Sequence, residues 1–175
     1  MTATMYEPIG LPALGQGGIF WFPTLANRAA PKVTESTLNL TCVPDAGWEP
    51  TFEQAAGSKM KYCSDSEFEV PGKGKWTGGT FTSEWDPQDP NDVLVYKHVT
   101  ALAEGTGGYL GQRLGLDRDV NLTAGDILSL LIPVRWGKQV PVPIDSSSDG
   151  QLLQIQQRYF VTGRVLQNVA VVAGA

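Results

Sequence analysis

Apolar and polar residues alternate along most of the chain, and this period of two predicts β-strands rather than helices. In Lys32–Val43, for example, Leu38, Leu40 and Cys42 alternate with polar neighbours. Ile127–Trp136 is apolar at odd and even positions alike, which predicts a strand covered on both faces. The strands expected from these patterns are Lys32–Val43, Lys59–Val70, Lys75–Trp85, Tyr109–Leu116 and Ile127–Trp136. Ile19–Phe22 is either a buried strand or an aromatic anchor, and Leu152–Ala173 is two strands, or one bent strand, around Gly163.

One segment departs from this pattern and predicts a helix of about 15 residues, Pro90–Glu104. Asp89 is a favourable N-cap, Pro90 suits the first helical position, and Gly105 suits the stop. Three apolar residues at positions i, i+4 and i+7 form a stripe that would pack this helix on a sheet as a brace: Val95, Val99 and Leu102.

The segments between these elements are rich in Gly, Pro, Ser and Asp, and predict loops and turns. They are Pro44–Gly57, Pro71–Lys75, Asp117–Asp126 and Val140–Gln151. Gly78-Gly79 predicts a bulge or a close backbone approach. We therefore expect an N-terminal arm, residues 1–18, and a single β-rich domain, residues 19–175. Its fold class would be mainly β, a β-sandwich or partly closed barrel with one packed α-helix.

Composition narrows the function. The 175 residues include 13 basic and 18 acidic residues, a net charge of -5, so the chain lacks the excess of Lys and Arg that grips duplex DNA. The two cysteines, Cys42 and Cys63, are expected to be reduced thiols, and the sequence leaves open whether they pair. The N-terminus shows no signal peptide and no apolar run is long enough to span a membrane, so we expect folding in a cytoplasm.

Residues that carry chemistry are sparse, and we predict no catalytic, cofactor-binding or metal-binding site and no enzyme activity. The single histidine, His98, falls inside the predicted helix, and the glycine-rich runs lack the lysine of a phosphate loop. Glu84, Asp86, Asp89 and Asp92 lie close together, but helix capping explains the last two. The tryptophans at positions 48, 76, 85 and 136 are expected in the core or at interfaces, rather than as a stacking platform for sugars or bases.

Two polar surfaces stand out, and the family resemblance described next makes them candidates for an interface or a channel lining. One is the acidic face of the Lys59–Val70 strand, with Glu67 and Glu69, while Lys73 and Lys75 of the following turn could pair with acidic groups of a neighbouring copy. The other is a largely uncharged row that shares one strand face: Gln154, Gln156 and Arg158. A solvated surface is the alternative for both.

Phe68–Gly115 resembles the major tail tube proteins of long-tailed, siphovirus-like bacteriophages. Those sequences have a strand, a W-x-G-like step, an aromatic-acidic corner, a short helix, and a glycine turn into a strand with an Arg. Here these pieces are Trp76-Thr77-Gly78-Gly79, Trp85-Asp86, Pro90–Glu104, Gly105–Gly108 and Arg113. Gly17–Ser36 also resembles the opening strand and Ala-Pro loop of that family.

The resemblance implies a structural virion protein that self-assembles into stacked rings, commonly hexamers, and is located in the tail after assembly in the host cytoplasm. The rings would stack through the N-terminal arm and long loops. They would line a channel for the tape-measure protein and for DNA during genome ejection, and would meet tail terminator and tail tip proteins. The alternatives are another β-type virion component (head–tail completion or capsid decoration) and a carbohydrate-binding β-sandwich with Trp76 and Trp85 as its platform.

Overall fold

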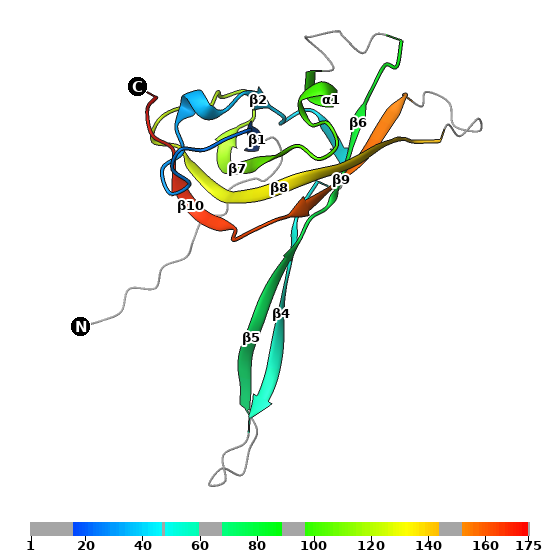
Figure 1. Cartoon of the computed structure of the whole chain (residues 1–175). Coiled ribbons are helices and arrows are strands. Elements are labelled where there is room, and N and C mark those ends of the chain that lie inside the picture. Colours follow the sequence, from blue (N-terminus) through cyan, green and yellow to red (C-terminus); the bar gives the residue numbers. More distant parts are fainter. Residues whose placement is uncertain (1–15, 47, 60–67, 89–96, 144–151, 175) are drawn as a thin grey trace. The chain divides into compact units, whose positions relative to one another are not determined.

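The computed structural model describes residues 16–46, 48–59, 68–88, 97–143 and 152–174, and these are mainly β, as predicted (Figure 1). The described strands are β1 (Gln16–Phe22), β2 (Leu38–Asn39), β3 (Pro44–Ala46), β4 (Thr51–Lys59), β5 (Phe68–Thr77), β6 (Thr80–Glu84), β7 (Gly107–Asp117), β8 (Ile127–Pro141), β9 (Gln154–Val161) and β10 (Leu166–Ala170). The helical elements of the described residues are a 3₁₀ turn, η1 (Val33–Glu35), and one short α-helix, α1 (Lys97–Ala101).

The described strands form two sheets. In the larger sheet the hydrogen-bonded order is β2-β1-β7-β8-β9-β6-β3, with β10 also paired to β8, and the second sheet is the β4-β5 hairpin. The chain separates into two compact units. Unit 1 comprises Met1–Thr41, Leu110–Leu131 and Leu166–Ala175, and unit 2 comprises Cys42–Tyr109 and Ile132–Val165. β7 and β8 therefore contribute residues to both units.

Unit 1 is built around β1, whose last five residues are buried. Because both faces of this strand are covered, Ile19–Phe22 is a buried strand rather than a surface anchor. The prediction of a strand over Lys32–Val43 is wrong for most of its length: the segment forms η1 and only two strand residues, Leu38–Asn39. The Glu35 carboxylate holds this turn by accepting hydrogen bonds from the N–H groups of Ala26 and Lys32, at 2.9 and 2.8 Å.

Unit 2 has an aromatic core between β6, β8 and β9. Trp136 meets Phe81 and Tyr159 edge-on, with ring centroids 5.5 and 5.7 Å apart. The close approach predicted at Gly78-Gly79 is confirmed, because a Cβ on Gly78 would overlap the carbonyl oxygen of Tyr159. Each of the three rings is at least 97% buried, so their packing contributes on the order of 2 kcal/mol per side chain.

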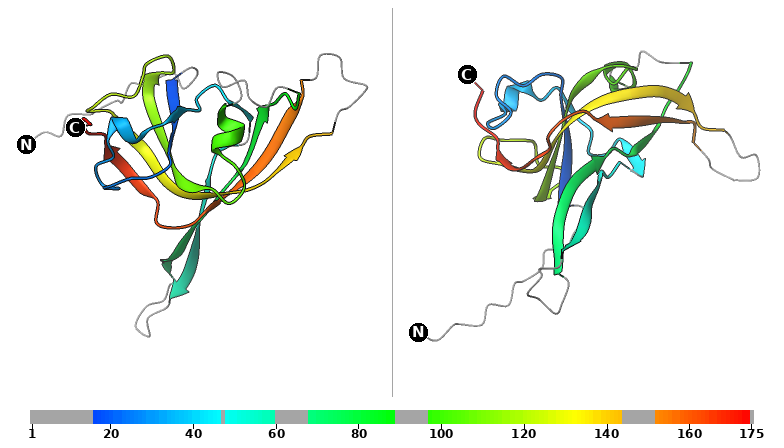
Figure 2. Two further views of the ribbon diagram at one scale, coloured as in Figure 1. Left: turned by 45° about the horizontal axis from the view of Figure 1, so that its top comes forward. Right: turned by 60° about the horizontal axis from the view of Figure 1, so that its bottom comes forward.

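The β4-β5 hairpin contradicts two of the predicted loops. Thr51–Lys59 is a strand where Pro44–Gly57 was expected to be a loop, and Pro71–Lys75 lies within β5 rather than in a turn. The outer edges of a two-stranded ribbon need no ladder hydrogen bonds, so Pro71 is tolerated there although it has no N–H. Figure 2 shows β4 and β5 side by side from two further directions. Of the strand predicted over Lys59–Val70, residues 60–67 lie outside the described residues.

The helix α1 is attached to the sheet of unit 2 by polar side chains from three strands. Ser83 Oγ of β6 lies 3.0 Å from His98 Nε2. Gln139 Nε2 of β8 donates to the Val99 carbonyl at 2.8 Å, and Gln157 Nε2 of β9 donates to the Leu102 carbonyl at 2.7 Å. The two amides thus bind carbonyl groups at the C-terminal end of the helix, which have no partner within it.

The apolar stripe predicted for the helix is described only in part. Leu102 is buried and Val99 is half-buried, while Asp89, Pro90 and Val95 lie outside the described residues. Gly105 has a positive φ of 81° and therefore occupies the left-handed turn expected after the helix.

The C-terminal half follows the predicted pattern closely. The strands at Tyr109–Leu116 and Ile127–Trp136 are present, and Leu152–Ala173 contains two strands, β9 and β10. β8 continues to Pro141, so the predicted Val140–Gln151 loop begins too early by two residues.

Candidate functional site

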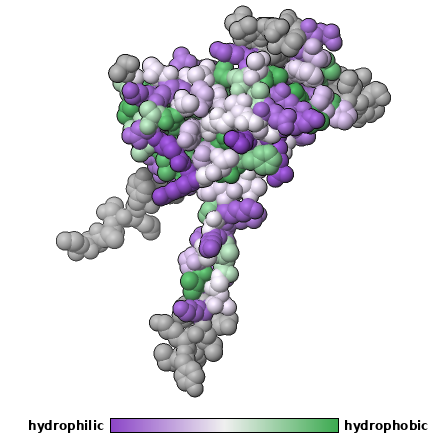
Figure 3. Space-filling view, in the orientation of Figure 1, coloured by the Kyte–Doolittle hydropathy of each residue, from purple (hydrophilic) through white to green (hydrophobic). Residues whose placement is uncertain are grey.

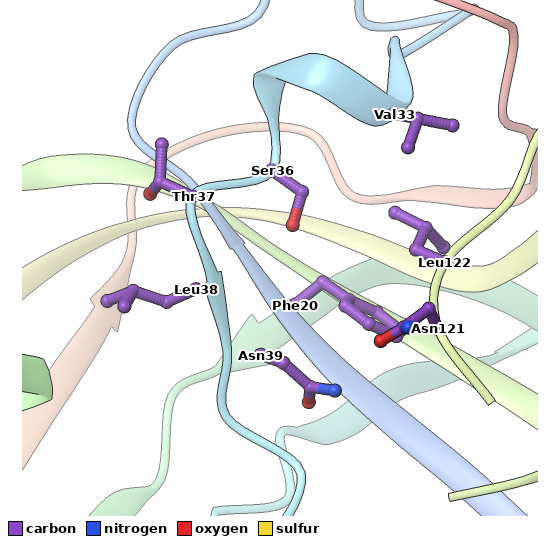
Figure 4. Close-up of a pocket in the computed structure, with 8 residues that line it drawn as sticks. All are labelled: Phe20, Val33, Ser36, Thr37, Leu38, Asn39, Asn121 and Leu122. Carbon is purple, nitrogen blue, oxygen red and sulfur yellow. The ribbon is translucent and has the colours of Figure 1, made fainter. Parts of the chain in front are cut away.

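The described residues offer little for catalysis or small-ligand binding. No group of three or more His, Cys, Asp or Glu among them could hold a metal ion. His98 is buried and hydrogen-bonded to Ser83, and no described helix is long and apolar enough to cross a membrane. A shallow pocket of about 210 Å³ in unit 1 has mixed polar and apolar walls without a charged group (Figure 4). Its lining residues are Phe20, Val33, Ser36, Thr37, Leu38, Asn39, Asn121 and Leu122.

The β4-β5 hairpin is the most exposed described part of the chain. All nine residues of β4 are exposed, as are Glu69–Lys75 of β5. Figure 3 shows hydrophilic and hydrophobic residues interspersed along it without a covering layer on that side. In its described part, the ring of Phe52, 49% exposed, contacts that of Trp76, with ring centroids 4.9 Å apart. Trp76, one of the two tryptophans of the alternative sugar-binding platform, is half-buried and packs on Phe52.

Three of the predicted interface residues lie on this hairpin. Lys73, Lys75 and Glu69 are exposed on β5, and Lys75 faces Glu53 across the ladder. Glu67 lies outside the described residues. Such exposed pairs contribute little to the stability of one chain, so these charges remain available to a partner.

The second predicted row lies on β9 and faces outward. Gln156 and Arg158 are exposed and Gln154 is half-buried, whereas Ile155, Gln157 and Tyr159 on the opposite face are buried. The structure adds two residues to this row. Phe160, 48% exposed, is paired with Arg135 of β8, and the guanidinium of Arg158 lies over the Phe160 ring at 5.3 Å. Arg135 was missed because only the β8-β9 register brings it there.

A polar cluster joins Arg113 of β7 to the β7-β8 loop, and sequence reasoning named Arg113 without assigning it this role. Arg113 is fully buried, and its guanidinium binds the Asp126 carboxylate at 2.7 Å. The same guanidinium donates to the carbonyl groups of Asn121, Asp117 and Val120, and lies over the Phe20 ring at 5.3 Å. One side chain thus fixes a loop of nine residues, 118–126, by its backbone.

The charge state of Asp126 fits this role. Burial acts to raise the pKa of the carboxyl group, but hydrogen bonds from the Thr123 N–H, the Arg113 guanidinium and the Thr123 hydroxyl outweigh it and hold the pKa below its usual value. The carboxylate is therefore charged when it faces the buried guanidinium. The family resemblance pointed to Arg113 within a predicted strand but gave it no role, and local spacing did not identify Asp126 as its partner.

Comparisons with known proteins identify solved structures whose chains are similar to this one. In a cryo-EM structure of an extracellular contractile injection system, the PVC sheath/tube terminator in its extended state, a chain matches with a TM-score of 0.51 at 9% identity. The match covers 93% of this chain and 98% of that one. The tube-terminating cap structure of the anti-feeding prophage contains a chain that matches with a TM-score of 0.48 at 12% identity, over 97% of each chain. A search of curated proteins finds no significant match.

At 9% identity, the likeness to the chain of the sheath/tube terminator structure shows the fold alone, and the sequence itself shows the family. The family model described as phage tail tube protein matches residues 5–174, nearly the whole chain. This protein is therefore a member of the phage tail tube protein family, and a structural component of that tube.

Proposed function

We propose that the chain assembles with copies of itself into rings, hexameric by analogy with the family, that stack to form the tail tube. Tape-measure protein and then DNA occupy the channel, and terminator and tip proteins close the two ends. The chain acts mechanically and carries out no catalysis.

The observation that carries this proposal is the exposed β4-β5 hairpin. A two-stranded hairpin without a packed face is at best marginally stable in water. Here every described residue of β4 is exposed, and only Trp76, Thr77 and their surroundings near the base are half-buried. A surface of this kind becomes stable when a second copy covers it. The charges of Glu69, Lys73 and Lys75 then supply polar contacts that the tube repeats in every subunit.

Open sheet edges also support self-assembly of the chain. Among the strands that the structure describes, the order of the larger sheet ends at β2 and β3, and each of these two is paired on one side only. Unpaired strand edges promote association, and a closed ring removes them. The net charge of -5 also suits a channel through which DNA slides, because such a surface releases few counterions and holds phosphate weakly.

The proposal is tested by replacing Phe52–Trp76 with an Asn-Gly turn, which leaves the Thr51–Thr77 pair to close the shortened hairpin. The aromatic core of Phe81, Trp136 and Tyr159 lies outside this segment, so the variant should keep a cooperative melt and lose only the contribution of the deleted aromatic residues to the near-ultraviolet circular dichroism. We expect it to sediment as small species and to form no tubes in negative-stain images. Tubes of normal length from this variant would contradict the role of the hairpin.

A further inference from the structure

We propose that, in the assembled tube, the exposed face around Arg135, Arg158 and Phe160 of one copy binds the β7-β8 loop of a neighbouring copy. This inference rests on the proposed self-assembly and identifies two surfaces that meet. We call the first the basic face, formed by Arg135, Val140, Arg158 and Phe160. We call the second the clamped loop, formed by Leu116 and Asp117 at the end of β7 together with Asp119 and Val120 of the β7-β8 loop.

The basic face is continuous across β8 and β9. Arg135 pairs with Phe160, and beyond a register shift between Trp136 and Gln139, Val140 pairs with Gln156. Residues two apart on β9 share a face, so Arg158 projects from the same side of the sheet as Gln156 and Phe160. Phe160 and Val140 are 48% and 51% exposed. A Cβ on Gly137 would lie 3.1 Å from the Phe160 ring, so the absence of a side chain at Gly137 leaves room for the ring.

No carboxylate in the described part of the chain pairs with the charge on this face. Among the described residues, neither Arg135 nor Arg158 is within 4.0 Å of a carboxylate. Glu84 shares the face, but it pairs with Gln154, four residues before Arg158 on β9 and so about 13 Å away along the strand. Two guanidinium groups beside an exposed ring are typical of an interface, since Arg and aromatic residues are enriched there.

The same charge argues against placing this face in the channel. Each cation that neutralises a phosphate releases counterions and strengthens DNA binding. Two arginines in each subunit, repeated along a tube, would retain DNA that has to pass. A protein partner with carboxylates is the better match.

The clamped loop presents carboxylates and apolar side chains that complement the basic face. Asp117 and Asp119 are exposed, the side chain of Asp119 to 84%, and Val120 and Leu116 are 43% and 41% exposed. Arg118 lies 3.9 Å from Asp119 and leaves the loop with two carboxylates against one guanidinium. Carboxylates can bind Arg135 and Arg158 through paired hydrogen bonds, while Val120 and Leu116 cover Phe160 and Val140.

The hydrogen bonds and ion pair of Arg113 hold the loop in one conformation before it meets a partner. Three loop carbonyls and Asp126 are bound from inside, so the loop loses little freedom when a partner binds. Because the basic face and the clamped loop are different surfaces of the same chain, their contact is head-to-tail. Contacts of this type generate closed rings or continuing stacks.

Charge reversal tests the proposal. Arg158→Glu should raise the protein concentration needed for half-maximal assembly about tenfold or more, since close interfacial charge pairs are strongly coupled. Asp119→Arg should do the same, and the Arg158→Glu/Asp119→Arg double variant should recover most of the loss. Arg118→Glu is the matched control, because it makes the same charge change on the loop and should leave assembly unchanged or stronger.

A crosslink provides a second readout. In a Cys42→Ser/Cys63→Ser background, a mixture of Arg158→Cys and Asp119→Cys proteins should give disulfide-linked dimers on oxidation of assembled material. Equal assembly by all charge variants and no crosslink would overturn the inference, while tubes from the wild-type chain would still support the proposed function. Normal assembly combined with a salt-dependent loss of DNA retention in Arg158→Glu would assign the face to DNA instead. Failure of the wild-type chain to assemble would overturn both.

Discussion

Replacement of Asp126 by Asn should destabilise the folded chain strongly, because it leaves the Arg113 guanidinium buried without its counter-charge. Arg113 is fully buried, the Asp126 side chain is only 10% exposed, and the two are 2.7 Å apart. Removing one partner of a buried pair costs about 3–5 kcal/mol. Arg113 keeps its hydrogen bonds to three loop carbonyls, so we expect the lower end, about 3 kcal/mol.

For a chain of this size, about 3 kcal/mol corresponds to a fall in Tm of roughly 6–12 °C. The assay is urea or thermal unfolding of the unassembled protein, followed by tryptophan fluorescence. Arg113→Met should cost at least as much, since it leaves the carbonyl groups of Asn121, Asp117 and Val120 without their donor. In the Arg113→Met/Asp126→Asn double variant the losses should be less than additive, because the pair forms one network.

The exposed carboxylate of Asp119 provides the control. It lies 3.9 Å from Arg118 with both side chains largely in solvent, so Asp119→Asn should leave the free energy of unfolding unchanged within error. If Asp126→Asn also proved neutral, the clamp would not hold the β7-β8 loop, and the loop could not be regarded as prepared for binding.

Three further predictions concern single contacts. Because folding lowers the pKa of Asp126, its ionised carboxylate contributes fully to stability above the unfolded-state pKa of about 3.9, and this contribution is lost as the pH falls through the folded-state pKa. In acid titrations, the free energy of unfolding should therefore fall less steeply with pH for Asp126→Asn than for the wild type. Gly78→Ala should cost about 1–3 kcal/mol or more in thermal melts, since its Cβ meets the Tyr159 backbone, and a neutral result would show that the strands can separate there. Burial raises the pKa of Tyr159 to about 12, and its hydroxyl donates to the Trp48 carbonyl. Absorbance titration should therefore show no ionisation of Tyr159 near pH 10, and ionisation of Tyr159 at that pH would contradict this packing.

Alternation in the sequence was a reliable guide where a strand packs on a core. β9 shows this well, because buried Ile155, Gln157 and Tyr159 alternate with exposed neighbours, as the apolar pattern indicated for the two apolar residues. β8 likewise reads as apolar on both faces and is buried on both over Leu131–Val134. Because the core requires apolar residues on the buried face of a strand, the sequence keeps the period of two in these strands.

The same reasoning failed where no core imposes a pattern. β4 and β5 have exposed residues on both faces, so polar residues, Pro71 and several glycines are all accepted, and the segment resembles loops. At Lys32–Val43 the alternation is real, but the Glu35 side chain binds the backbone N–H groups and a turn replaces most of the strand.

Sequence reasoning likewise succeeded for some of the polar residues and failed for others. Gln156 and Arg158 could be assigned to one exposed face from spacing alone, because residues two apart share a face of a strand. Arg113, Arg135 and the two glutamines that hold α1, Gln139 and Gln157, could not be assigned. Their roles depend on which strands are neighbours, and this long-range pairing is not written in local periodicity.

Tube formation is tested most directly by cryo-electron microscopy of the wild-type chain, purified and concentrated, alone and with tail initiator proteins. We expect stacked rings around an open channel, with the β4-β5 hairpin and the basic face buried between copies. A monodisperse monomer at every concentration, with or without initiator, would contradict the proposed assembly.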